Sequence, residues 1–423
     1  MPTVTRGVLR YNVTNRTLQL LTSIGMVLVA LGCDHGTPRP PTEPAEVAAP
    51  HSGTIARAHR ASDVESSSTP TANPASATSE LALARRSKRE FARDFHQLSE
   101  SGEYFFSDNT ISNETSYLQV AGDLTREVAP GGAYLGVGPE QNFTYIALTR
   151  PSIAYIVDIR RDNALLHLLY KAVFHRAKTR AEFVTLLLGR PYDPTGDPGV
   201  AGDVSAVLLH AQRNPPDEAL FRTTHRQLVK DISGWGIALS AQDERRLEAM
   251  HRSFFDQQLD LRFALHEANG RTYPTLEQLL SSRDPSGSQL GFLATRAGFE
   301  TVQRLQRLHR VVPVVGDFAG THAIQGVAKE LKQRGLFVSA FYVSNVEQYL
   351  FEPAKWTQYV ANVQALPVRD DAVFIRCYLD QGRRHPRQLP GHRTSTMLQP
   401  VSRFFDQQGR GGYQTFWQLV TDI

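Results

Sequence analysis

The chain is poor in cysteine, with only Cys33 and Cys377 among its 423 residues. Two cysteines so far apart exclude a disulfide framework, and no CxxC pair is present. The histidines do not fall at the spacings of metal ligands either. We therefore expect no metal site. The hydrophobic fraction of 41% and charged fraction of 21% are those of an ordinary globular protein.

An excess of charge of one sign is also missing. The net charge is +4, and Lys and Arg alternate with Asp and Glu along the whole chain. This pattern argues against a nucleic-acid partner. The sequence contains no GxSxG elbow and no GxxxxGK[ST] loop, which excludes an α/β-hydrolase with that nucleophile turn and a P-loop nucleotide site.

No apolar run near the N-terminus is long enough for a membrane helix, which needs about 20 residues. The run at 18–31 is shorter, follows Arg6, Arg10 and Arg16, and leads to Gly-Cys at Cys33. A basic start, a short apolar core and a small residue at the cut are typical of a secretory signal.

Residues 30–33, Ala-Leu-Gly-Cys, resemble a bacterial lipobox, in which the cysteine is acylated. The resemblance implies a signal peptide over 1–33 and an exported, membrane-anchored lipoprotein of a bacterial cell envelope, lipidated at Cys33. An uncleaved anchor with an incidental cysteine is the alternative. Residues 34–87 are rich in Pro, Ser, Thr and Ala, which predicts a disordered linker.

Residues 88–423 alternate short apolar runs with segments of helical periodicity. The runs are bounded by Gly, Pro or Asp, as in parallel strands covered on both faces; they are residues 133–135, 153–158, 311–315, 337–343 and 373–379. This alternation predicts parallel pairing through right-handed crossovers. We expect a Rossmann-like α/β domain over 88–423, with a large helical insertion at 163–310.

A glycine turn follows the first of these runs. Gly136 and Gly138 end it, and Asp158 ends the next run 22 residues after Gly136. A carboxylate about 20 residues after such a turn accepts hydrogen bonds from ribose hydroxyls. The spacing predicts a nucleoside-type ligand. The alternative is a glycine turn in which Asp158 forms a structural salt bridge with Arg160 or Arg161.

Polar residues also follow two later strands. Asp317 comes after the run at 311–315, and Glu347 and Tyr349 come after 337–343. Ligands of open α/β sheets bind outside the carboxyl ends of the strands. These residues are therefore candidates for catalysis or binding, with capping of the following helices as the alternative.

Four blocks of the sequence resemble an uncharacterised bacterial family with an S-adenosylmethionine methyltransferase-like fold. The resemblance extends from about Phe91 to the C-terminus, and its blocks are residues 131–143, 156–161, 315–320 and 341–350. It implies that the chain binds S-adenosylmethionine through Gly136, Gly138, Glu140, Asn142 and Asp158. It also implies that Asp317, Glu347 and Tyr349 lie near the acceptor or the transferred methyl group.

The sequence departs from the general methyltransferase pattern at two positions of the glycine turn. Tyr134 stands where an acidic residue is usual, and Glu140 replaces the third glycine.

Two functions follow from this resemblance. The first is a membrane-anchored enzyme that transfers methyl from S-adenosylmethionine to an unknown small molecule or protein, with Asp317 or Glu347 as a base. The second is a non-catalytic surface lipoprotein that uses the fold as a binding or interaction module. Export favours the second, because S-adenosylmethionine is made in the cytosol. A third interpretation is an inefficient signal and a cytosolic domain.

A basic stretch near the C-terminus adds one more candidate. Residues 383–387, with His392 and Arg393, either contact acidic lipid or polymer or form a solvated loop.

Overall fold

The computed structural model describes residues 86–199, 201–267 and 270–423. The predicted signal peptide 1–33, its Cys33 and nearly all of the predicted linker 34–87 lie outside the described residues. Among the described residues, no helix combines the length and apolar character needed to cross a membrane.

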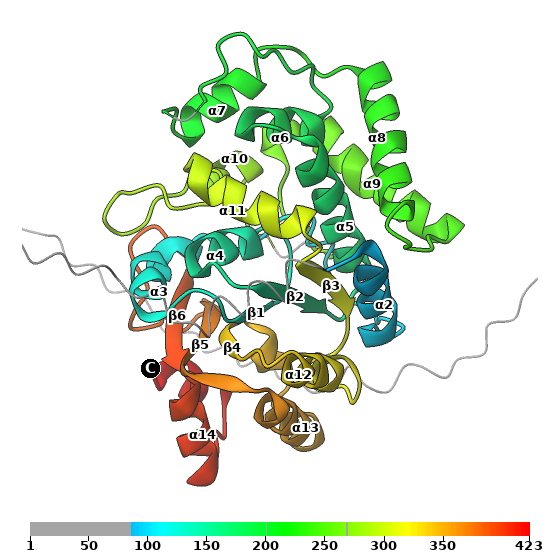
Figure 1. The fold of residues 1–423 in the computed structure, drawn as a ribbon. Coiled ribbons are helices and arrows are strands. Elements are labelled where there is room, and N and C mark those ends of the chain that lie inside the picture. Colours follow the sequence, from blue (N-terminus) through cyan, green and yellow to red (C-terminus); the bar gives the residue numbers. More distant parts are fainter. Residues whose placement is uncertain (1–85, 200, 268–269) are drawn as a thin grey trace, which may run out of the picture. The chain divides into compact units, whose positions relative to one another are not determined.

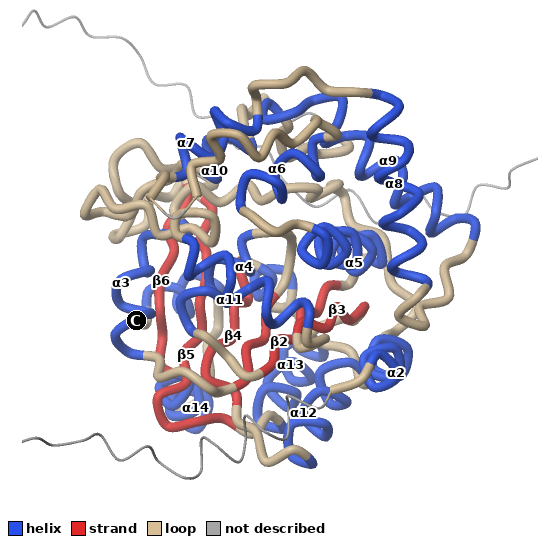
Figure 2. Tube along the Cα trace, turned by 45° about the horizontal axis from the view of Figure 1, so that its top comes forward, coloured by secondary structure: helices blue, strands red, loops and turns tan. Residues whose placement is uncertain are grey.

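One mixed sheet of six strands organises the described chain (Figures 1 and 2). Its strands are β1 (Ala133–Gly136), β2 (Ile153–Asp158), β3 (Val311–Val315), β4 (Val338–Ser344), β5 (Val368–Leu379) and β6 (Thr394–Pro400). The order is β3-β2-β1-β4-β5-β6, and only β6 runs antiparallel to its neighbour. The α/β class and the mostly parallel sheet are confirmed.

Helices cover the sheet on both sides. In Figure 1, α4 (Gln141–Thr149) and α5 (Arg161–Arg176) lie above the strands, and α12 (Ala323–Gln333), α13 (Pro353–Ala365) and α14 (Val401–Gly409) lie below them. The remaining elements outside the β2–β3 segment are α2 (Lys88–Leu98), η1 (Tyr117–Val120), α3 (Ala121–Glu127), η3 (Val346–Tyr349) and α15 (Phe416–Thr421).

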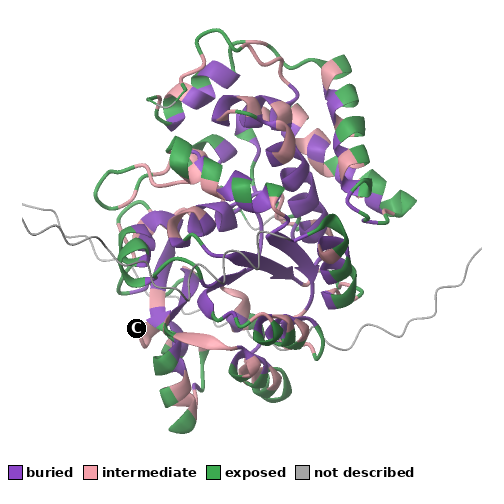
Figure 3. Ribbon diagram, in the orientation of Figure 1, coloured by how far each residue is buried: buried purple, intermediate pink, exposed green. Residues whose placement is uncertain are grey.

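The segment between β2 and β3 is helical for most of its length. After α5 it contains α6 (Arg180–Leu188), α7 (Val204–Ala211), α8 (Glu218–Ser233), α9 (Ala241–Gln257), η2 (Gln258–Asp260), α10 (Leu276–Leu280) and α11 (Arg296–Arg307). α5 is buried almost all round, whereas α8 and α9 expose their outer faces (Figure 3). A helix buried on most sides is apolar on most sides, which explains the leucine-rich sequence of α5.

Strands β1, β2 and β3 are buried on both faces, so they have continuous apolar sequences rather than alternating ones. β3 tolerates Pro313 because it is an edge strand. Proline has no backbone N–H, but on the open side of an edge strand there is no neighbouring strand with which that group would bond.

Candidate functional site

The carboxyl edge of the sheet, where open α/β folds bind ligands, is crossed by residues 99–116, which we call the strap. The strap leaves α2 and meets the strands in their spatial order. Glu100 N donates to Val315 O of β3 at 2.8 Å, and Glu103 N donates to Ile159 O, just after β2, at 2.9 Å. At the far end, Ser116 Oγ lies 2.7 Å from Thr394 Oγ1 of β6.

The side chain of Glu100 fixes the loop that follows β3. Its carboxylate accepts from Asp317 N at 3.1 Å and from Ala323 N at 2.9 Å. Ala323 is the first residue of α12, so a strap residue satisfies one of the free donors at the start of that helix.

The glycine turn after β1 is held by Asn142 rather than left open. The Asn142 amide nitrogen lies 2.8 Å from the carbonyl oxygens of Val137 and Pro139, and its Oδ1 accepts from Tyr134 OH at 2.9 Å. A Cβ on Gly136 would lie 1.9 Å from that same Oδ1. Only glycine fits at position 136, and the reason is an internal contact.

Gly138 requires glycine for a different reason. Its φ is +74°, a left-handed conformation that side chains disfavour. Its N–H points to Asp158 Oδ2 at 3.3 Å, and its carbonyl accepts from His167 Nε2 at 2.8 Å. Burial lowers the pKa of His167 to about 4, so the ring stays neutral and donates from one nitrogen.

Asp158 is fully engaged by its own chain. Its Oδ1 accepts from Arg160 N at 2.9 Å and Arg160 Nε at 3.1 Å, and its Oδ2 accepts from Arg160 Nη2 at 2.9 Å and from Gly138 N. These four donors use all the acceptor sites of a carboxylate. Arg160 also donates from Nη1 to Asp108 O of the strap at 2.8 Å. The salt bridge with Arg160, considered as the alternative from the sequence, is present.

Glu114 of the strap lies between β1 and β4, at the topological switch point. Its carboxylate accepts from Tyr342 OH at 2.9 Å, from Gln141 Nε2 at 2.9 Å and from Ser344 Oγ. Burial raises the pKa of Glu114, although these hydrogen bonds oppose the shift. Ser344 has a positive φ of 53°, so the backbone at the end of β4 is strained where it meets Glu114. A buried carboxyl group of the strap therefore lies at the carboxyl end of β4, the edge at which open α/β sheets bind ligands.

Asp317, a catalytic candidate from the sequence, stabilises its own loop. Its Oδ1 accepts from Ala319 N at 2.9 Å, two residues further on, and its backbone is held by Glu100. This contact is an Asx turn within the loop, and it differs from the helix cap considered from the sequence, because the N-cap residue of α12 is His322.

Glu347, the second candidate, is completely buried in an ion pair with Arg376. Arg376 Nε donates to Oε2 at 2.5 Å and Nη2 donates to Oε1 at 2.9 Å, while Tyr359 OH donates to Oε1 at 2.7 Å. The guanidinium lies 4.2 Å from the centre of the Phe374 ring. With these donors in place, Glu347 has no path by which to take a proton from a ligand.

Tyr349, the third candidate, is 40% exposed. Its ring packs edge-on against Phe105, with centroids 5.6 Å apart, and against Phe106. The three catalytic candidates thus have three different environments, and no contact joins their side chains among the described interactions.

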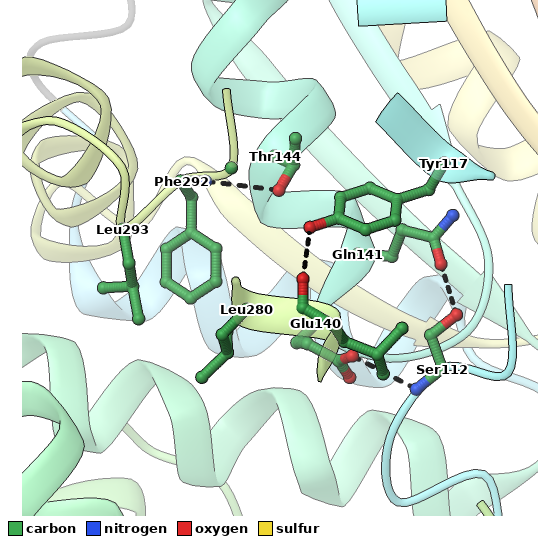
Figure 4. A pocket seen from close by; sticks show the side chains of 10 residues that line it. Ser112, Tyr117, Glu140, Gln141, Thr144, Leu280, Phe292 and Leu293 are labelled. Atoms are coloured by element: carbon green, nitrogen blue, oxygen red, sulfur yellow. Dashed lines mark hydrogen bonds between the residues drawn. The ribbon is translucent and has the colours of Figure 1, made fainter. Parts of the chain in front are cut away.

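Glu140, placed in the cofactor set from the sequence, lines a small cavity beside α4 (Figure 4). Its Oε1 accepts from Ser112 N of the strap at 3.1 Å, while Oε2 is buried without a hydrogen-bond partner. Burial raises the pKa of Glu140 to about 7. The cavity of about 10 Å³ is large enough for about one water molecule and for nothing larger.

Among the residues that the structure describes, no group of three His, Cys, Asp or Glu side chains could hold a metal ion.

The strap's role was not predicted from the sequence. Glu100 and Glu114 lie in a polar loop without periodicity or motif, and their partners are distant in the chain. The pairing of Asp158 with Arg160 was the one contact of this site that the local sequence indicated, because residues two apart at a strand end can face each other.

A family model matches residues 109–190 and 235–413, which is well over half of the chain. The chain belongs to that family, described as a domain of unknown function (DUF7790). The matched residues include every strand of the sheet and the second half of the strap, whereas α7 and α8 lie in the unmatched gap. No curated protein matches the chain.

Proposed function

We propose that this protein is a non-catalytic binding module, built on a Rossmann-like fold and anchored to a bacterial envelope membrane through acylated Cys33. The strand order supports the Rossmann-like assignment, because 3-2-1-4-5-6 is the order of the doubly wound nucleotide-binding sheet. The antiparallel β6 is the one departure from that arrangement.

The pairing of Asp158 with Arg160 is the observation that carries the proposal. A nucleoside ribose would have to displace Arg160 from a carboxylate that is 4% exposed. Separating a buried ion pair costs about 3–5 kcal/mol. A hydrogen bond to a charged group returns about 1.5–3 kcal/mol. The ion pair between Asp158 and Arg160 is therefore more stable than a contact between Asp158 and a ribose.

The catalytic candidates support the same conclusion. Glu347 is neutralised by Arg376, and Asp317 accepts from the backbone of its own loop. General-base catalysis needs a carboxylate within hydrogen-bond reach of the substrate proton. Glu347 does not meet that condition, because it is completely buried and both its oxygens accept from its own chain.

Calorimetric titration of the full chain with S-adenosylmethionine, its demethylated product and adenosine tests the proposal. We expect no binding up to millimolar ligand and no methyl incorporation into added protein. Binding that disappears in Asp158→Asn but survives in Asp371→Asn would overturn the proposal in favour of a methyltransferase-like enzyme. Asp371 is the matched control because it also pairs with an arginine two residues away, Arg369.

A further inference from the structure

A larger cleft lies at the same edge of the sheet, beyond the strap, where β5 ends and β6 begins. Its volume is about 520 Å³, within the range of about 300–1,000 Å³ for small-molecule sites. The walls come from the strap, the loop before α10, α10 itself and the β5–β6 loop. The lining residues used below are Thr115, Arg262, Arg271, Tyr273, His392 and Arg393.

The charge of this cleft is of one sign. Arg262, Arg271, Arg393 and His392 line it, and no aspartate or glutamate is among its lining residues. The nearest carboxylate along the β5–β6 loop, that of Asp380, accepts from Gly382 N at 2.8 Å within the loop itself. Guanidinium groups that converge on one hollow favour an anion, and most of all a phosphate group.

Internal contacts hold the loops that carry three of these basic residues before any ligand binds. His392 Nδ1 lies 3.0 Å from Thr115 Oγ1 of the strap, and the carbonyl of Arg393 accepts from Asp380 N at 2.9 Å. Arg262 Nη1 donates to Tyr273 O, which ties together the two arms of the loop before α10. Such preorganisation lowers the entropy that binding must overcome.

Apolar side chains complete the wall of the cleft. Tyr273, Pro274, Leu279 and Leu379 line it beside the arginines. A basic rim over apolar surface suits an organic molecule that carries a phosphate better than it suits a bare ion.

The basic stretch at 383–387 is separate from this cleft. Arg383 lies over the Trp417 ring, 3.6 Å from its centre, and none of these five residues lines the hollow. Of the basic residues noted near the C-terminus, His392 and Arg393 are the ones that face it.

We infer that this cleft binds a small organic molecule through its phosphate group, held by Arg262, Arg271 and Arg393. The inference does not depend on how the glycine turn is closed, since neither Gly136, Gly138 nor Asp158 lines the cleft. The phosphate can come from a soluble phosphomonoester or from a lipid headgroup, and the experiment separates these two sources.

The test is calorimetric titration of the full chain with inorganic phosphate and with glycerol phosphate, alongside co-sedimentation with vesicles of anionic or zwitterionic phospholipid. We expect saturable binding that weakens as salt is raised. Arg393→Gln and Arg262→Gln should each lower the affinity about tenfold, the effect of losing a charged hydrogen bond. Binding of soluble phosphates identifies a free ligand, and binding of anionic vesicles alone identifies a lipid headgroup.

Arg410→Gln is the matched control. Arg410 is an exposed arginine after α14, a helix that starts where β6 ends, at the opposite edge of the sheet. The affinity of Arg410→Gln for the phosphate probes should stay within about twofold of that of the parent protein. Absence of binding to every probe, or an equal loss in Arg410→Gln, would overturn the inference. Because Arg262 and Arg393 are exposed, both variants should fold, which an unchanged thermal transition would establish.

Discussion

At the residue scale, the features that suggested a cofactor site have internal explanations. Gly136 is required by the Oδ1 of Asn142, and Asp158 is occupied by Arg160. A motif in the right order at the right spacing therefore indicates a strand–turn–helix–strand unit. Whether a ligand completes it depends on side chains from elsewhere in the chain.

Glu347→Ala tests whether this buried carboxylate is structural. The substitution leaves the guanidinium of Arg376 buried without its partner, so we expect a loss of about 3–5 kcal/mol in the free energy of unfolding, measured with urea.

Glu218→Ala is the comparison for that measurement. Glu218 pairs with two arginines, Arg222 and Arg252, but on an exposed helix surface, where solvent screens ion pairs, so we expect a much smaller loss. Equal, small effects of the two substitutions would argue against a structural role for Glu347.

Glu140→Gln should change the pH dependence of stability. In the folded chain the pKa of Glu140 is raised to about 7, whereas in the unfolded chain the group ionises near its ordinary value of 4.5. The unfolded state therefore loses its proton first, and the parent protein loses stability as pH rises from 4.5 through 7. Glutamine does not titrate.

The free energy of unfolding of Glu140→Gln relative to the parent should thus rise by about 3 kcal/mol between pH 4.5 and pH 8. Urea denaturation at the two pH values measures this change. A difference between the two proteins that stays constant with pH would show that Glu140 is not the buried acid described above.

At the element scale, the sequence predicted the strands well because each of β1 to β4 is buried on both faces and therefore continuously apolar. β6 was missed. Its sequence, Thr-Ser-Thr-Met-Leu-Gln-Pro, has no apolar run, and its polar side chains are buried by partners such as Ser116 that no local pattern reveals. The strap was missed for the same reason.

Glu100→Ala tests the strap as an element. The loss of two backbone contacts, to Asp317 N and Ala323 N, should lower the free energy of unfolding by about 1–3 kcal/mol and make the strap more sensitive to limited proteolysis.

Glu103→Ala is the control within the same strap, because the Glu103 side chain is exposed and only its backbone N–H binds Ile159 O. Cleavage that increases equally in both variants would mean that the Glu100 carboxylate does not hold the strap.

At the scale of the whole molecule, the N-terminal predictions concern residues that the structure does not describe. Cys33→Ala should leave an unprocessed precursor in a bacterial host that acylates lipoproteins, because the cysteine is the residue that would be modified. Labelling with a radioactive fatty acid measures acylation, and the shift of the protein on a gel measures processing of the precursor. Normal processing of Cys33→Ala would rule out the lipobox.

The distances along the chain between the strap and its partners also lead us to expect an order of assembly. Glu100 meets residues 217 and 223 positions later, and Ser116 meets a residue 278 positions later. Contacts of such separation form late, because a long loop must close first. The strap is thus secured after the later segments that it meets, and a chain that stops short of β6 would lack the contacts of Ser116 with Thr394 and Thr396.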